Sequence, residues 1–328
     1  MTIREIASLA GVSSAAVSRY FNDGYVGQEK REAIRKVVED TGYRPSLQAQ
    51  TLRTKRTMTI GVIVPKIDSY PVGQVVAGIT SVLEERGYRL LLAVSDQKPE
   101  KELEYLGVLG EKQVDGVILL ATLLCARLRE RLRQMRVPVV LAGQRLEGCG
   151  CVYHDDYHAM HAMTELVLSK GRKSICYIGV TNQDRAVGAE RIRGFRDAIA
   201  KGGLPLTEEN VETGDFTVAS GYQGMEALYR RNPRVDGVVC ATDEIAVGAM
   251  GYLRERGRII GRDVLVTGQG DSVLAANVTP SLTTIRYYYE DCGRESADMI
   301  LERIEQGRNS LGEVRLGFEL VEHESTGR

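Results

Sequence analysis

The chain opens with the stretch Thr2-Ile-Arg-Glu-Ile-Ala-Ser-Leu-Ala-Gly-Val-Ser13, which decides how its first domain folds. Thr2 and Glu5 have the spacing of a capping box, in which a hydroxyl and a carboxylate satisfy two free backbone N–H groups where a helix begins. Gly11 then permits a sharp turn, and Ser13 can cap a second helix. The helix before the turn has one apolar face, formed by Ile6, Ala7 and Ala10.

A second helix is predicted from Ser14 to about Asn22, with Val17 and Phe21 facing inward. A third helix is predicted over residues 28–41, with a buried stripe of Ala33, Ile34, Val37 and Val38. A helix, a tight turn and a helix form the helix-turn-helix plan. In that plan the second helix lies in the major groove of DNA, and its first residues meet the base edges.

The second helix offers several groups to DNA. Ser14, Ala15 and Ala16 come first, and Ser18 and Arg19 stay on the exposed face. Ala15 can contact a thymine methyl group, whereas Arg19 is the strongest candidate for a bidentate contact to guanine or phosphate. The alternative is that Arg19 is one more solvated surface cation. Its place on the groove-facing side of the helix favours DNA contact.

Charge is distributed unevenly along the chain. Residues 1–56 contain ten Lys and Arg against six Asp and Glu, a net +4, so the whole-chain net charge of -1 leaves -5 for residues 57–328. A basic head suits the electrostatic attraction of phosphates that supplies most non-specific affinity for nucleic acid. The 328 residues suit two or three compact domains.

The composition also argues against several classes of protein. The six cysteines are scattered and have no partner at zinc-like spacing, so we expect reduced thiols and no metal site. Neither a signal peptide nor an apolar run long enough to span a membrane is evident, which predicts a cytoplasmic protein without a membrane partner.

From Met58 onward, short apolar strands alternate with amphipathic helices, a pattern typical of parallel α/β layering. The strands predicted for a first lobe are residues 59–65, 89–94, 116–121 and 138–142. Those predicted for a second lobe are residues 174–179, 210–213, 237–241 and 263–267, with helices such as 157–170 and 189–202 between them. Ligands of open α/β sheets bind beyond the C-terminal strand ends, so the loops there should line one cleft.

Both parts of the chain resemble the lactose/galactose/purine repressor (LacI/GalR) family. In the head the resemblance rests on residues 2–13, Ala16-Val-Ser-Arg19, Asn22 and Thr41-Gly-Tyr-Arg-Pro45. In the body it rests on residues 211–216, 220–222, 240–250 and 282–285, which are similar to the sensor domain of the family and, through it, to periplasmic sugar-binding proteins. The implied fold is an all-α helix-turn-helix head followed by a two-lobed α/β sensor.

The resemblance implies a helix-turn-helix domain at residues 1–45 and a hinge at residues 46–57 that orders on DNA. It also implies that Leu52 wedges into the minor groove beside Arg53, although Leu52 can instead pack against the body. Gly27 stands where the family usually has Ser, and it should still cap the third helix acceptably. The candidate DNA contacts are Thr2, Ser13, Ser14, Ala15, Ala16, Ser18, Arg19, Asn22, Leu52 and Arg53.

The effector-binding and dimerisation domain is then residues 58–328. The resemblance implies an N-lobe of about 58–156 plus 287–317 and a C-lobe of about 157–285 plus 318–328. The family's effector positions fall on Asp68, Ser69, Tyr70, Gln144, Arg145, Arg185, Arg191, Phe216, Thr242, Asp243, Gln269 and Tyr287. Aromatic faces can stack on sugar rings, while carboxylates, amides and arginines can bind hydroxyl or phosphate groups.

Some of these positions have other interpretations. Arg191 can form a helix-surface ion pair with Glu190 or Asp197, Phe216 can be a core residue, and Asp243 can be only a helix cap.

The chain departs from the family's pattern in two loops. Gly143 stands where many relatives carry a carboxylate after the fourth strand, and Gly268-Gln269-Gly270-Asp271 stands where they show Gly-Phe/Tyr-Asp-Asp, so two sugar-anchoring acids are missing. Without those acids, Arg145, Arg185 and Arg191 favour an anionic ligand, which predicts a phosphorylated sugar rather than a neutral one.

Two other classes of protein compete with a regulator. A sugar-processing enzyme fits a two-lobed cleft, but the sequence has no phosphate loop, nucleophile elbow or dinucleotide fingerprint. The run His154-Asp155-Asp156 lacks a nucleophile and is interpreted as structural. A transport binding protein would need an export signal and no DNA-binding head. The sequence therefore favours a homodimeric transcription regulator that binds double-stranded operator DNA and a sugar or sugar phosphate, with no cofactor and no enzymatic activity.

Overall fold

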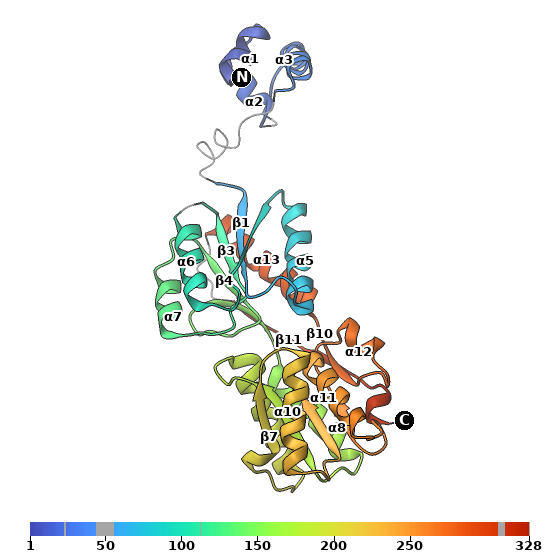
Figure 1. Ribbon diagram of the computed structural model, residues 1–328. Coiled ribbons are helices and arrows are strands. Elements are labelled where there is room, and N and C mark those ends of the chain that lie inside the picture. The colour runs from blue at the N-terminus through green and yellow to red at the C-terminus, as the bar shows by residue number, and fades with distance from the viewer. Residues whose placement is uncertain (23, 44–55, 112, 308–311, 328) are drawn as a thin grey trace. The chain divides into compact units, whose positions relative to one another are not determined.

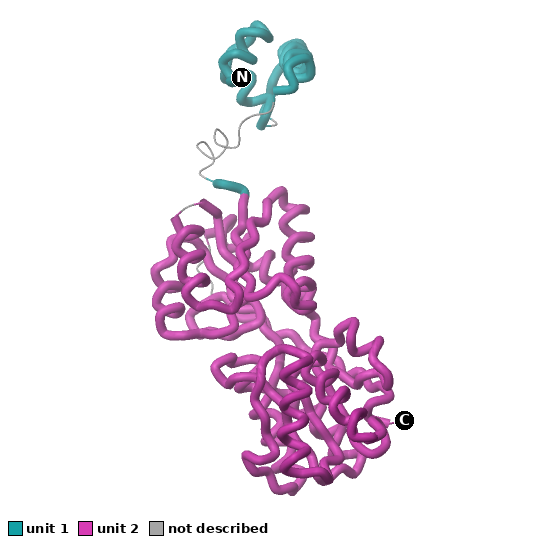
Figure 2. The backbone as a smooth tube through the Cα atoms, in the orientation of Figure 1, with its two compact units in different colours: residues 1–58 teal, residues 59–328 magenta. Residues whose placement is uncertain are grey.

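The computed structural model describes residues 1–22, 24–43, 56–111, 113–307 and 312–327. The chain forms two compact units, residues 1–58 and residues 59–328, which Figure 2 distinguishes by colour. The predicted wedge Leu52 and its neighbour Arg53 lie outside the described residues.

The first unit is a small helical head. Its helices are α1 (Ile3–Leu9), α2 (Ser14–Tyr20) and α3 (Gln28–Thr41). Thr2 and Glu5 form the predicted capping box, and Gly42 ends α3 in the left-handed conformation with φ 61°. The three helices pack around a core of Ile6, Ala7, Ala16, Val17 and Ile34.

The N-lobe of the second unit is built on a six-stranded parallel sheet with the order β11-β5-β4-β3-β1-β2. Its strands are β1 (Thr59–Val64), β2 (Arg89–Val94), β3 (Gly116–Leu119), β4 (Val139–Ala142), β5 (Gly150–His154) and β11 (Glu313–Leu316). Figure 1 shows α5 and α13 on one side of this sheet and α6 and α7 on the other. These helices are α5 (Tyr70–Glu85), α6 (Pro99–Gly110), α7 (Ala126–Arg133) and α13 (Tyr289–Gln306).

The helices α5 and α13 approach each other unusually closely, and glycines make this possible. A Cβ atom added at Gly78 would lie 2.0 Å from the carbonyl oxygen of Glu290, and one at Gly293 would lie 2.1 Å from that of Val75. Neither backbone can retreat without moving its helix, so only glycine fits at these two positions.

The C-lobe has a four-stranded parallel sheet with the order β7-β6-β8-β9. Its strands are β6 (Ile175–Val180), β7 (Val211–Gly214), β8 (Gly237–Cys240) and β9 (Leu265–Thr267). The helices are α8 (Asp156–Ser169), α9 (Arg191–Lys201), α10 (Val218–Arg231), α11 (Asp243–Glu255) and α12 (Val273–Asn277). A single π-helical segment, η1 (Arg185–Glu190), precedes α9.

Three chain segments connect the lobes. Strand β5 of the N-lobe leads into α8 of the C-lobe, and β10 (Thr284–Tyr287) of the C-lobe leads into α13 of the N-lobe. Strand β11 then returns to β12 (Phe318–Val321), which pairs antiparallel with β10. The ends of β5, β10 and β11 therefore form the hinge between the two lobes. We call this connection the hinge, and it is distinct from the predicted hinge at residues 46–57.

The eight strands predicted from the sequence are present, but four others were missed: β5, β10, β11 and β12. Each of these is four or five residues long and lies in or beside the hinge. The long apolar run that marks a buried parallel strand is absent from them, so their patterns gave no signal.

Within the part of the chain that the structure describes, no helix is long and apolar enough to cross a membrane. The same residues contain no cluster of three or more His, Cys, Asp and Glu that could hold a metal ion. All six cysteines are free thiols, of which Cys125 is exposed and Cys149 is half-buried.

Candidate functional site

The second helix of the head begins with a side-chain cap. The hydroxyl of Ser13 accepts a hydrogen bond from the backbone N–H of Ala16 at 3.2 Å, and Thr2 caps α1 in the same way. The predicted DNA contacts Thr2 and Ser13 therefore also hold the two helices of the motif in place, and both remain exposed.

Helix α2 presents one face to the surroundings and one to the core of the head. Ser14, Ala15 and Arg19 are exposed, as is Asn22 just beyond the helix, and Ser18 is half-buried. Ala16 is only 7% exposed because its methyl group packs in the head core, so its prediction as a base contact is wrong. The amide of Asn22 donates to the backbone carbonyl of Ser18.

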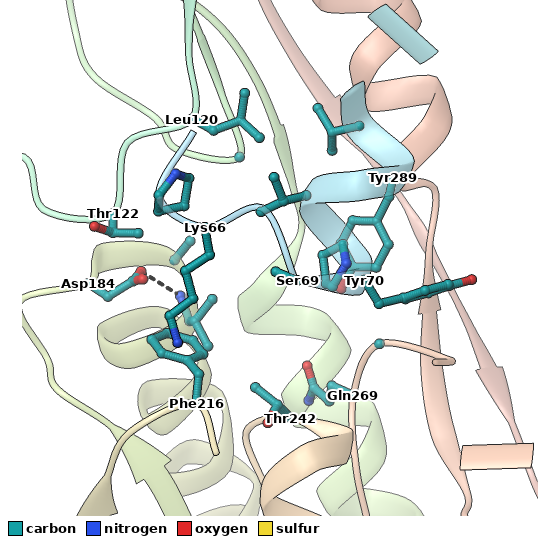
Figure 3. Close-up of a pocket in the computed structure, with 18 of the residues that line it drawn as sticks. Lys66, Ser69, Tyr70, Leu120, Thr122, Asp184, Phe216, Thr242, Gln269 and Tyr289 are labelled. Carbon is teal, nitrogen blue, oxygen red and sulfur yellow. Dashed lines mark hydrogen bonds between the residues drawn. The ribbon is translucent and has the colours of Figure 1, made fainter. Parts of the chain in front are cut away.

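In the second unit, a cavity of about 360 Å³ lies between the lobes. Loops that follow the C-terminal ends of the parallel strands line it from both sides, as open α/β sheets predict. We call it the effector cleft. Figure 3 shows Lys66, Ser69 and Tyr70 entering from the N-lobe, with Phe216, Thr242 and Gln269 on the C-lobe side.

The N-lobe wall of the cleft combines buried residues, such as Gln144 and Leu120, with partly or fully exposed side chains that follow β1 and β2. Asp68 is exposed, while Lys66, Ser69 and Tyr70 are half-buried after β1 and at the start of α5. Gln97, in the loop after β2, is also exposed. These groups lie in water until a ligand or the opposite wall covers them.

The C-lobe wall contains a buried ion pair. Arg191 and Asp156 are each 5% exposed, and two nitrogens of the guanidinium, Nε and Nη2, lie 2.8 and 2.7 Å from Oδ1 of Asp156. The guanidinium also lies over the ring of Tyr287, 4.9 Å from its centre. Arg191 therefore pairs with neither Glu190 nor Asp197, and its charge is neutralised within the wall.

Two further C-lobe side chains are held by the hinge strand β10. Gln269 is 2% exposed and accepts a hydrogen bond from the hydroxyl of Tyr287. Asp243 is fully buried and accepts hydrogen bonds from Thr284 at 2.6 Å and from the backbone N–H of Ser272 at 2.8 Å. Burial raises the pKa of Asp243 to about 6.

The cap of α11 is Thr242, whose hydroxyl accepts from the N–H of Ile245 at 3.3 Å. Asp243 follows this cap, so the interpretation of Asp243 as the helix cap is wrong. Its two oxygens instead tie the Ser272 loop to β10 at the floor of the cleft.

A buried side-chain hydrogen bond crosses the cleft. Nε2 of Gln144, in the loop after β4, donates to Oδ1 of Asp184, in the loop after β6, at 2.8 Å. Both side chains are buried, and Asp184 also accepts from the N–H of Val187 at the start of η1. Burial raises the pKa of Asp184. This contact links the two lobes directly.

Most of the predicted effector residues line the cleft, namely Asp68, Ser69, Tyr70, Gln144, Arg191, Phe216, Thr242, Asp243 and Gln269. Phe216 also packs against the C-lobe core, and its role in effector binding stays a prediction. Arg145, Arg185 and Tyr287 do not line it, and their role in effector binding stays a prediction. The two arginines point to an adjoining cavity, and Tyr287 lies beneath Arg191.

Several residues that line the cleft were not predicted from the sequence: Lys66, Gln97, Asp156, Asp184, Thr217, Glu244, Ser272 and Tyr289. Asp184 lies in the loop after β6, just as the predicted residue Gln144 lies in the loop after β4. This position after a parallel strand could have identified Asp184 as a cleft residue. Tyr289 stands two residues after the Tyr287 that was predicted.

The cleft is acidic rather than basic. Five carboxylates line it, those of Asp68, Asp156, Asp184, Asp243 and Glu244, against two cations, Lys66 and Arg191. An anion entering the cleft would therefore meet excess negative charge. This charge balance disfavours a phosphate group within the effector cleft itself, while the predicted phosphorylated sugar stays a prediction.

A helix-turn-helix head joined to a two-lobed α/β domain with a polar interlobe cleft defines a ligand-responsive DNA-binding regulator. Residues 2–46 match the family model described as bacterial regulatory proteins, lacI family. Residues 57–324 match the model described as periplasmic binding proteins and sugar binding domain of LacI family. The chain belongs to the LacI family of transcription regulators.

Individual relatives agree with this assignment. The chain is 32% identical to the HTH-type transcriptional regulator RegA of Clostridium saccharobutylicum, over 99% of each chain. Among solved structures it is similar to a transcriptional regulator CelR–cellobiose complex, with 30% identity, a TM-score of 0.78 and 99% of each chain covered. A lac repressor dimer bound to operator and an anti-inducer shares the fold, with a TM-score of 0.90 and 23% identity over 100% of this chain and 99% of that one.

Proposed function

We propose that this regulator binds a near-palindromic operator as a homodimer and that a neutral, hydroxyl-rich sugar in the effector cleft changes its operator affinity. The observation that carries the proposal is the interlobe cleft, in which buried carboxylates and amides from the C-lobe face exposed polar side chains of the N-lobe. The cellobiose bound to CelR, a relative of similar architecture, supports a sugar as ligand.

The chemistry of the cleft suits hydroxyl groups. Asp156, Asp184 and Gln269 offer oxygen acceptors, Arg191 offers donors, and the half-buried ring of Phe216 offers an apolar face for a sugar ring. We propose that sugar binding draws the N-lobe side chains onto the preformed C-lobe wall. The resulting change of lobe arrangement alters the spacing of the two heads in the dimer.

On DNA, we propose that α2 enters the major groove, with Ser14, Ala15 and Arg19 toward the bases. Two heads related by a twofold axis would reach half-sites one helical turn apart, about 34 to 36 Å. We propose a repressor of carbohydrate-utilisation genes that acts in the cytoplasm, where its DNA target lies, and that has no enzymatic activity.

The proposal is tested by selecting duplexes from a random library with the purified full-length protein and measuring their affinity by fluorescence anisotropy. Arg19→Ala is expected to lower discrimination at one base pair by about 1–3 kcal/mol. Arg35→Ala, an exposed arginine on α3, is the matched control and should retain full discrimination. Failure to enrich any sequence over random duplex would overturn the proposal.

The ligand is tested by thermal-shift screening against neutral sugars and their phosphates. A neutral mono- or disaccharide should raise the unfolding temperature and emerge unchanged from incubation with the protein. Conversion of the sugar into a product would favour the competing interpretation as an enzyme.

A further inference from the structure

A second cavity, of about 290 Å³, adjoins the effector cleft at the hinge. The two cavities share the lining residues Gly143, Gln144, His154, Asp156 and Ala186. What distinguishes the second cavity is a set of four arginines, Arg145, Arg185, Arg193 and Arg315, and we call it the arginine cavity.

The four arginines come from both lobes. Arg145 follows β4 and Arg315 lies on β11, so both belong to the N-lobe. Arg185 begins η1 and Arg193 lies in the first turn of α9, so both belong to the C-lobe. A ligand bound by all four would therefore connect the lobes across the hinge.

Each arginine has an acidic neighbour, but the ion pairs occupy only part of the donor set. Nε of Arg145 donates to Glu313 at 2.8 Å, and Nη1 of Arg315 lies 3.5 Å from Asp155. Glu190 is shared, at 2.6 Å from Nη2 of Arg193 and 4.0 Å from Nε of Arg185. A guanidinium carries five N–H donors, so these contacts leave donors for a ligand on every arginine.

The arginines are also accessible. Their side chains are 46 to 57% exposed, in contrast to the 6% of the Arg191 side chain in the effector cleft. Half-exposed guanidinium groups that converge on one cavity suit a doubly charged oxyanion, which accepts several N–H bonds at once.

Two buried polar atoms on the shared wall have no hydrogen-bond partner among the described residues. They are Oε1 of Gln144 and Nε2 of His154, whose residues are only 3% and 9% exposed. Burial lowers the pKa of His154, which disfavours the charged form of its ring. Since buried polar atoms are normally paired, these two acceptors point to a ligand hydroxyl at the junction of the cavities.

We propose that the arginine cavity binds a small dianion of the phosphate or phosphate-monoester class, held by guanidinium groups of both lobes. The dianion bridges Arg145 and Arg315 to Arg185 and Arg193 and so stabilises one lobe arrangement over the other. Its phosphate group comes either from a free ion or from a sugar phosphate that reaches past Gln144 and His154 into the effector cleft.

The test measures binding of inorganic phosphate to the full-length protein by calorimetry and thermal shift, against chloride at equal ionic strength. R193Q removes a C-lobe guanidinium and R315Q an N-lobe one. R196Q is the matched control, because Arg196 lies on the same helix as Arg193, pairs with Glu208 and lines neither cavity.

Phosphate should bind the wild type and R196Q alike and should bind R193Q and R315Q at least about tenfold more weakly, as expected when a charge-assisted donor is lost. R193K, which keeps the charge, should recover part of the loss. Equal phosphate binding by all variants, or none above the chloride control, would overturn the proposal.

A second arm distinguishes the sources of the phosphate and rests on the proposed function. Glucose 6-phosphate is titrated into wild type and Tyr70→Ala, which changes only the effector cleft. If Tyr70→Ala weakens the binding of glucose 6-phosphate but not that of inorganic phosphate, the ligand spans both cavities. Unchanged binding identifies a separate anion. Both outcomes support an anion site in the arginine cavity. Operator preference and neutral-sugar binding are measured separately, so that a failure of the proposed function can be distinguished from a failure of this site.

Discussion

The two walls of the effector cleft are built differently. On the C-lobe side, Arg191 and Asp156 are buried and form an ion pair with each other. Gln269 is also buried and accepts a hydrogen bond from Tyr287. On the N-lobe side, Gln144 is also buried, but Asp68 is exposed in the loop after β1 and Tyr70 is half-buried at the start of α5. Fixed groups lose little entropy on binding, whereas surface side chains must be ordered by the ligand.

This difference assigns the walls different tasks. The C-lobe wall is a preformed binding surface whose polar groups also stabilise the lobe. The exposed side chains of the N-lobe wall would have to be ordered by a ligand, so we expect ligand binding to change the arrangement of the lobes through them. Substitutions on the two sides should therefore separate stability from ligand affinity.

The largest effect is expected from breaking the buried ion pair of the C-lobe wall. Arg191→Met leaves the Asp156 carboxylate buried without a partner and should lower the free energy of unfolding by about 3–5 kcal/mol. Urea denaturation measures this cost. Arg196→Met, on the same helix but exposed, should change stability by less than about 0.5 kcal/mol. Equal costs for both variants would contradict a stabilising C-lobe wall.

A second prediction concerns the pH dependence of the same wall. Burial raises the pKa of Asp243 to about 6 from its ordinary 3.8, so the folded protein takes up this proton at a higher pH than the unfolded chain does. The unfolding free energy contributed by Asp243 therefore rises as the pH falls from above 6 toward 4, by about 2–3 kcal/mol.

Comparison with Asp243→Asn, by urea denaturation between pH 4 and pH 7.5, isolates this contribution. The wild type should gain stability relative to the variant as the pH is lowered through this window. A stability difference that is independent of pH would show that Asp243 does not titrate in this way.

On the N-lobe wall, Tyr70→Ala should affect ligand binding rather than stability. Loss of a ring contact to the sugar should weaken binding by about 0.5–1.5 kcal/mol, while the urea midpoint stays unchanged. Calorimetry with the sugar found by thermal shift measures the affinity. Ile67→Ala is the control, because Ile67 is 69% exposed in the same loop and does not line the cleft. If Tyr70→Ala binds the sugar as tightly as Ile67→Ala does, Tyr70 of the N-lobe wall does not contribute to sugar binding.

The smallest effect is expected in the head, away from both walls. Gly27 precedes α3 with no side-chain cap, and a Cβ added there meets nothing within 4 Å. Gly27→Ser should stabilise the head by a few tenths to about 1 kcal/mol, by capping and by restricting the unfolded chain. Amide hydrogen exchange of residues 28–41 measures this, and sugar affinity should not change.

Local patterns in the sequence predicted the parts of the fold that have strong local signals. The capping box at Thr2 and the buried runs of β1 and β6 are recognisable without tertiary contacts. The hinge strands β10 and β12 were missed because they are defined by their pairing with each other across distant parts of the chain.

The loops that line the candidate site could be predicted from their positions along the chain. The direction in which each side chain points, and therefore which cavity it lines, could not. Arg145 and Arg185 were assigned to the effector cleft from their loops, yet both line the adjoining cavity. The pairing of Arg191 with Asp156 joins residues 35 positions apart, and nothing in the spacing shows that the two charges cancel. Because of this pairing, Arg191 contributes no net positive charge that would attract a phosphate into the effector cleft.

The most direct test of the account measures the coupling between DNA and sugar in both directions. Operator affinity is determined with and without saturating sugar, and sugar affinity with and without saturating operator. We expect both affinities to change by the same factor, of about 5 to 150, because in the proposed mechanism the two sites depend on one lobe equilibrium. A sugar dissociation constant that is the same with and without bound operator would contradict the account.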